Sequence, residues 1–149
     1  MRSFLSARHA CGILRAPMSR ESVELVRGVM DGFFSGDIAS VFSAFGPAIE
    51  FRPPPEHPDF GVYHGHDEVR RAFSRWIGAW EALRYDPPDY VDAGDRVLAV
   101  SRQRGRAKGS GIEVETEFAI LFEIHDGRIV RFDMFFDRGE AVEAAGLRE

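Results

Sequence analysis

The stretch Ile112–Phe136, IEVETEFAILFEIHDGRIVRFDMFF, has the most regular hydrophobic pattern of the chain. From residue 112 to residue 124, every second side chain is apolar or threonine, and most of the side chains between them are glutamates. Alternation with a period of two is typical of a strand with one buried face. Asp126-Gly127 then fits a two-residue turn, so this stretch predicts a long β-hairpin.

Strict alternation through this hairpin predicts which residues share a face. Ile120 is expected opposite Asp133, and Phe118 opposite Phe135. Asp133 and Arg131 are therefore expected on the apolar face of the sheet. A one-residue β-bulge would turn Asp133 to the other face.

The preceding hairpin, which turns near residues 108–111, predicts three arginine–glutamate pairs: Arg102 with Glu117, Arg104 with Glu115 and Arg106 with Glu113. Opposite charges at directly opposed positions support an antiparallel register, so these pairs mark the exposed face. At its other end the same face is expected to carry Phe132, Met134 and Phe136. An apolar patch on an exposed face is typical of a subunit interface, so we expect a homodimer through these three residues.

The residues before this sheet predict three helices. The first begins near Ser19, the second carries apolar residues over 38–45, and the third is expected over 67–83. A short strand is expected over 49–52, and alternating patterns prevail after residue 88. Helices followed by a run of strands predict an α+β fold, with the helices packed on one face of a mostly antiparallel sheet.

Composition and charge exclude several classes of protein. The chain has 149 residues and a net charge of −5, which argues against binding to a phosphate backbone. No apolar run approaches the roughly 20 residues that cross a bilayer, so no membrane partner is expected. The single cysteine, Cys11, cannot form an internal disulfide, which favours a reducing compartment and a cytoplasmic location.

The first 18 residues differ from the rest, because they hold three arginines and no acidic residue. They are interpreted as a disordered tail, or as the product of an upstream start codon with Met18 as the natural start. The apolar stretch is shorter than that of a secretory signal, and an organelle transit peptide is a further alternative. We expect a single domain over residues 19–149.

Asp133 is the candidate catalytic residue. Among phenylalanine and isoleucine side chains, desolvation disfavours the charged form of a carboxyl group, which suits a general acid or base near neutral pH. The alternative is structural, with Asp133 accepting a hydrogen bond from a buried Ser101, Tyr63 or indole N–H. Arg131 is expected either to pair with Asp133 or an acidic ligand, or to extend its apolar stem to solvent.

Trp76 and Trp80 predict either an aromatic wall for a flat ligand or ordinary core packing. The candidate substrate-binding residues are Phe51, Tyr63, Trp76, Trp80, Ser101, Phe118, Ile120, Arg131 and Phe135. The chain has no phosphate-binding loop and no dinucleotide glycine motif, and its histidines at 57, 64 and 66 lack a zinc-site partner pair. We therefore expect neither a cofactor nor a metal.

Five short motifs follow one another along residues 19–147: Phe34-Ser35-Gly36-Asp37, Ile49-Glu50-Phe51-Arg52-Pro53, Val62-Tyr63-His64-Gly65-His66-Asp67-Glu68-Val69, Asp92-Ala93-Gly94-Asp95-Arg96-Val97 and His125-Asp126-Gly127-Arg128-Ile129-Val130. In these motifs the chain resembles the SnoaL-like polyketide cyclase group of the nuclear transport factor 2-like superfamily. The resemblance implies a cone-shaped α+β barrel with a pocket at its open end. It also implies that Asp133 occupies the place of the acid/base aspartate of SnoaL-like cyclases and limonene-epoxide hydrolases.

Two functions are consistent with these features. The first is a cofactor-free isomerase, cyclase or hydrolase that acts on a hydrophobic small molecule, with Asp133 as its acid/base group. The second is a non-catalytic ligand-binding or dimerisation domain, in which Asp133 only satisfies a buried polar partner. An open cavity that Asp133 reaches would favour the first.

Overall fold

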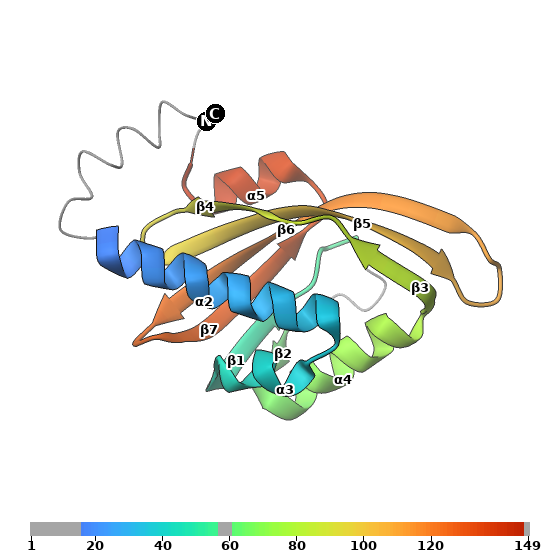
Figure 1. Ribbon diagram of the computed structural model, residues 1–149, viewed down its shortest axis with the longest axis horizontal. Coiled ribbons are helices and arrows are strands. Elements are labelled where there is room, and N and C mark those ends of the chain that lie inside the picture. The colour runs from blue at the N-terminus through green and yellow to red at the C-terminus, as the bar shows by residue number, and fades with distance from the viewer. Residues whose placement is uncertain (1–15, 57–60, 148–149) are drawn as a thin grey trace.

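The computed structural model describes residues 16–56 and 61–147, and the side chains from residue 20 onward. Residues 1–15 of the expected tail, with Cys11, lie outside the described residues. Three helices lie on one side of a curved, mostly antiparallel sheet, and a short fourth helix lies on the other side (Figure 1). This arrangement is the α+β fold that the sequence pattern predicts, with the cone shape that the family resemblance implies.

The helices begin close to their expected starts. Helix α2 spans Ala16–Ser35, and α3 spans Ile38–Ser43 with Asp37 as its cap, whose side chain accepts from the Ser40 amide at 3.3 Å. Helix α4 spans Gly65–Gly78. Its first turn is stabilised because a Glu68 carboxylate oxygen accepts a hydrogen bond from the backbone N–H of His64 at 2.8 Å.

Helix α4 ends five residues before the predicted end at residue 83. Residues Trp80–Tyr85 instead form strand β3, which pairs with the edge of strand β5. The sequence of Trp80–Tyr85 fits the spacing of a helix as well as the alternation of a strand. The strand forms because the edge of β5 offers backbone hydrogen bonds that a longer helix would leave unmade. The second predicted helix is also too long, because Phe45 is the first residue of strand β1, Phe45–Arg52.

The sheet has the strand order β2-β1-β7-β6-β5-β3, and β4 also pairs with β5. The remaining strands are β2 Tyr63–His64, β4 Asp89–Asp92, β5 Arg96–Ala107, β6 Glu113–His125 and β7 Arg128–Phe135. Strands β1 and β7 run parallel, and the other pairs are antiparallel. All three predicted arginine–glutamate pairs lie directly opposite each other between β5 and β6.

The register of β7 is shifted by one residue from the predicted one. Ile124 faces Ile129, but Glu123 faces Arg131, so Val130 is an extra residue in a β-bulge. Beyond the bulge, Asp133 faces Leu121 and not Ile120. The prediction that placed Asp133, Arg131 and Phe135 on the helix-covered face is therefore wrong.

The bulge has a plain energetic reason. It keeps Ile129 on the helix-covered face and also turns Phe132, Met134 and Phe136 to that face. Without the bulge, Arg131 and Asp133 would lie on the helix-covered face. Burying their charges is unfavourable, whereas burying phenyl rings is favourable. The homodimer surface predicted from these three apolar residues is thus wrong, because they face the interior. Self-association itself stays a prediction with no assigned surface.

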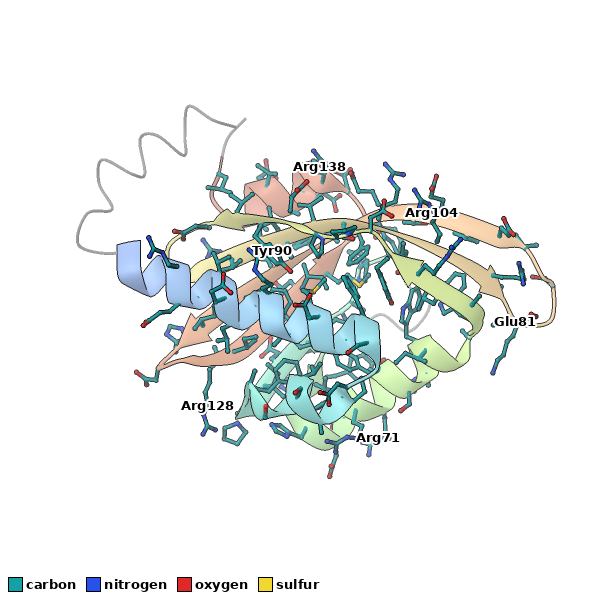
Figure 2. The ribbon with its side chains drawn as sticks, viewed as in Figure 1. Arg71, Glu81, Tyr90, Arg104, Arg128 and Arg138 are labelled. Atoms are coloured by element: carbon teal, nitrogen blue, oxygen red, sulfur yellow. The ribbon has the colours of Figure 1, made fainter. Side chains whose placement is uncertain are left out.

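The outer face of the sheet is covered at one end by helix α5, Arg138–Ala144. Leu98 and Leu121 are buried there together with Ala141 and Ala145. Arg104 and Arg138 lie on the side of the sheet away from α2 and α4 (Figure 2). Among the described residues, no helix is long and apolar enough to cross a membrane.

Candidate functional site

A cavity of about 570 Å³ lies between helices α2 and α4 and the inner face of the sheet. Eight of the thirteen phenylalanines of the chain line it: Phe33, Phe45, Phe51, Phe73, Phe118, Phe122, Phe132 and Phe136. The rings contact one another, with Phe51 and Phe132 stacked at a centroid distance of 4.6 Å. Volume and lining are typical of a site for a small apolar molecule.

Six of the predicted substrate-binding residues line this cavity: Phe51, Tyr63, Trp76, Trp80, Phe118 and Ile120. Ser101, Arg131 and Phe135 do not. Ser101 is buried near the cavity wall, but its hydroxyl donates to the backbone carbonyl of Asp86 at 2.6 Å. Arg131 and Phe135 lie on the outer face, because the bulge reverses the side of the sheet that they occupy.

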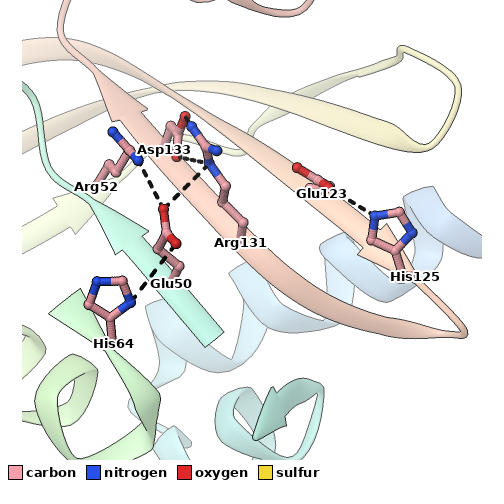
Figure 3. A network of polar contacts seen from close by, with 7 residues as sticks. All are labelled: Glu50, Arg52, His64, Glu123, His125, Arg131 and Asp133. Carbon is pink, nitrogen blue, oxygen red and sulfur yellow. Dashed lines mark hydrogen bonds and ion pairs between the residues drawn. The ribbon is translucent and has the colours of Figure 1, made fainter. Parts of the chain in front are cut away.

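Asp133 also lies outside the cavity. Its carboxylate accepts two hydrogen bonds from Arg131, with Nε at 3.0 Å and Nη2 at 2.8 Å (Figure 3). This bond to Asp133 raises the pKa of the Arg131 guanidinium. Glu50 joins the network 4.0 Å from Arg131 and 3.1 Å from Arg52. Asp133 therefore belongs to a network of ion pairs on the outer face and is not among the residues that line the cavity.

Polar groups in the cavity form a row across three neighbouring strands. Tyr85 of β3 lies opposite Gln103 of β5, and Gln103 lies opposite Thr116 of β6. All three line the cavity. Burial raises the pKa of the Tyr85 hydroxyl to about 12, against a smaller lowering by the Trp76 side chain, so Tyr85 is neutral near pH 7.

Gln103 is the most buried member of this row, with 3% of its surface exposed. Its side-chain oxygen has no hydrogen-bond partner among the described residues. The indole nitrogen of Trp80 is likewise buried, and it has no hydrogen-bond partner among the residues that the structure describes. Unpaired buried polar groups are costly and rare, so two in one wall are a feature to explain.

The Trp80 ring lies directly over Gly105, the next residue after Gln103 on the same face of β5. It packs edge-to-face against Trp76 at a centroid distance of 5.3 Å. At the solvent-exposed end of the cavity, Arg75 donates to the Tyr63 hydroxyl at 2.8 Å, and the exposed Glu56 completes the rim.

Among the described residues, no group of three histidine, cysteine, aspartate or glutamate side chains is placed to hold a metal ion. The Nε2 atom of His66 lies 3.1 Å from the backbone carbonyl oxygen of Gly46. The Nδ1 atom of His64 lies 3.9 Å from a carboxylate oxygen of Glu50. His57 lies outside the described residues.

Sequence reasoning missed Tyr85 and Arg75 as cavity residues. Tyr85 was missed because the third helix was predicted to run into β3. The alternation over Trp80–Tyr85, WEALRY, was the available signal. Arg75 lies one residue before Trp76 on α4, and no sequence pattern distinguishes it from other exposed arginines of that helix.

The profile of the SnoaL-like domain family matches residues 26–132. An uncharacterized protein of Mycobacterium tuberculosis (strain ATCC 25618 / H37Rv) is 30% identical over 124 residues, which cover 82% of this chain and 93% of that protein. The structure of a nuclear transport factor 2-like protein from Burkholderia thailandensis E264 is similar with a TM-score of 0.71 and 29% identity, covering 84% of this chain and 96% of that one.

TerC, in a crystal structure with polyporic acid, has a TM-score of 0.69 and 20% identity, over 85% of this chain and 98% of that one. At this identity the likeness concerns the fold alone. The match of the family profile over more than half of the chain and the 30% identity to the mycobacterial protein establish the family. This chain belongs to the SnoaL-like domain family and has the nuclear transport factor 2-like fold.

Proposed function

We propose that this protein binds a hydrophobic, ring-containing small molecule in the cavity between α2, α4 and the inner face of the sheet. The observation that carries the proposal is the cavity itself, about 570 Å³ in volume and lined by eight phenylalanines and both tryptophans. Flat apolar rings pack well against aromatic side chains, and removing them from water drives binding.

The lining supports binding better than acid/base catalysis. Its only carboxylate among the described residues is Glu56, which is exposed at the rim, and no described histidine lines the cavity. Tyr85 stays protonated near neutral pH, since burial raises its pKa to about 12. Catalysis of isomerisation, cyclisation or hydrolysis by Asp133 is not part of this proposal, because that carboxylate lies on the opposite face of the sheet.

The test uses the two tryptophans as reporters, because they are the only tryptophans of the chain and both line the cavity. N-phenyl-1-naphthylamine is a neutral aromatic probe that brightens in apolar surroundings and accepts energy from tryptophan. On titration into the protein, we expect saturable quenching of tryptophan emission together with saturable probe emission.

Two phenylalanine substitutions on helix α4 locate the bound probe. Ala72 lines the cavity, whereas Ser74 is exposed two residues further on. Ala72→Phe fills part of the cavity and should weaken probe binding about tenfold, while Ser74→Phe should leave it unchanged. Thermal melts check that both variants fold, and Met134→Phe is the second cavity-filling change. Equal probe affinity in the filled and unfilled proteins would disprove the proposal.

A further inference from the structure

The polar row of Tyr85, Gln103 and Thr116 interrupts an otherwise aromatic wall. These residues are direct neighbours across β3, β5 and β6, so their side chains leave the same face of the sheet side by side. The remaining sheet residues of that wall are phenylalanine, isoleucine, valine, methionine and Trp80, with Tyr63 at the solvent-exposed end. A ligand in the cavity therefore meets hydrogen-bonding groups along one edge and apolar surface elsewhere.

Gln103 is the centre of this row. Its amide oxygen is buried with no partner among the described residues, and the whole residue is 3% exposed. The last side-chain torsion of glutamine is soft, so the amide can turn toward a group inside the cavity at little cost. A ligand that donates a hydrogen bond here removes the penalty of an unpaired buried acceptor.

The neighbouring groups of the wall are donors. The Tyr85 hydroxyl lines the cavity beside Gln103 and is protonated near neutral pH, so its hydrogen can be donated to a ligand. Trp80, whose six-membered ring lies over Gly105, the next position after Gln103 on this face, carries a second donor, an indole N–H that is buried without a described partner. One acceptor beside two donors matches a ligand edge that carries both a hydroxyl and a ketone oxygen.

We propose, resting on the proposed binding function, that Gln103 and Tyr85 determine ligand specificity. Gln103 selects ring compounds with a hydroxyl group over their apolar isosteres, and Tyr85 selects those with a ketone oxygen. The selected class is hydroxylated aromatic ketones and related phenols. Discrimination comes from polar groups of the site that are left unpaired when an apolar isostere binds.

The hydroxyl arm of the test compares 2-naphthol with 2-methylnaphthalene, which have nearly the same shape, as competitors of N-phenyl-1-naphthylamine. The wild-type protein should prefer 2-naphthol. Gln103→Met, an apolar replacement of similar length, should reduce this preference about tenfold, through weaker binding of 2-naphthol and equal or tighter binding of 2-methylnaphthalene.

The ketone arm compares 2-acetonaphthone with 2-isopropenylnaphthalene, in which a methylene group replaces the ketone oxygen. Tyr85→Phe should weaken binding of the ketone several-fold and leave that of the isopropenyl compound unchanged. Thr116→Val, at the end of the row, is the control for a general loss of polarity in the wall.

The outcomes separate this inference from the function on which it rests. If the probe itself does not bind, the proposed function fails; if the probe binds but no compound displaces it, binding stands and the specificity inference is overturned. If both members of each pair bind equally well to the wild-type protein, binding stands and the specificity inference is overturned. If Gln103→Met lowers the melting temperature but weakens both naphthalenes equally, Gln103 supports the fold and does not select the ligand.

Discussion

The indole ring of Trp80 lies on the backbone of Gly105. A Cβ built on Gly105 would come within 2.5 Å of Trp80 Cε3 and 2.8 Å of Cζ3, distances that real atoms do not adopt. The absence of a side chain at residue 105 is therefore what allows the indole to form this part of the cavity wall.

Gly105→Ala should displace the Trp80 ring. Because the added methyl group meets a rigid ring, we expect a loss of about 1–3 kcal/mol in unfolding free energy, typical of overpacking. The tryptophan emission maximum should shift, and affinity for N-phenyl-1-naphthylamine should fall. Gly28→Ala is the matched control, since a Cβ there meets nothing within 4 Å and lies on helix α2, where alanine favours the helix. Unchanged emission in Gly105→Ala would mean that the ring does not rest on this glycine.

Asp133→Asn tests the placement of this carboxylate outside the cavity. The change weakens the two hydrogen bonds from Arg131 and should cost about 1 kcal/mol in unfolding free energy, since Arg131 is 40% exposed. Probe binding should stay as in the wild type, because Asp133 lies on the outer face. The measurements are a denaturant melt and the fluorescence titration. Loss of binding in a fully folded Asp133→Asn protein would contradict the observed register of β7.

The register of β5 and β6 could be predicted from the sequence because two independent patterns agree there. Alternating apolar residues and the pairing of Arg104 with Glu115 both require the same alignment. On β7 the alternation is a single signal, and it changes phase. The adjacent apolar residues Ile129 and Val130 mark that change, but nothing local distinguishes a bulge there from an ordinary strand.

The boundary between α4 and β3 was predicted wrongly for a reason other than the one that applies to β7. Trp76 and Trp80 are one helical turn apart, so their spacing fits a helix. The strand forms because the edge of β5 is free to pair with it, and that edge exists only once the fold is complete. The prediction that both tryptophans share one surface is nevertheless correct, since their rings are in contact. The predicted residues of β1, β2, β6 and the two tryptophans thus line the cavity, whereas Tyr85 and Arg75 were missed and the candidates on β7 were misplaced.

His125 should titrate above the ordinary range of histidine. Its ring hydrogen-bonds the Glu123 carboxylate at 2.8 Å, and this bond is the main reason that its pKa is raised from 6.5 (Figure 3). A pKa raised by folding adds stability that is fully present below about pH 6.5 and disappears as the pH rises through the folded-state value. Two-dimensional NMR titration of the histidine ring protons measures this pKa, with His125→Asn assigning the signal. Glu123→Gln should return the pKa toward 6.5, and an unmoved pKa in that variant would exclude Glu123 as the cause.

Tyr85 should ionise late and destabilise the fold when it does. Burial raises its pKa from 10 to about 12, which corresponds to about 3 kcal/mol in favour of the protonated form. The stability due to the neutral hydroxyl is complete below pH 10 and is lost as the pH rises toward 12. Tyr90 also has a pKa raised to about 12 by burial, so phenolate absorbance at 295 nm should show two late transitions among the three tyrosines. Tyr85→Phe should remove one of them and lessen the fall in melting temperature between pH 10 and 12. Two late transitions remaining in Tyr85→Phe would show that its hydroxyl is open to solvent and that the polar row of the cavity is not closed off from water.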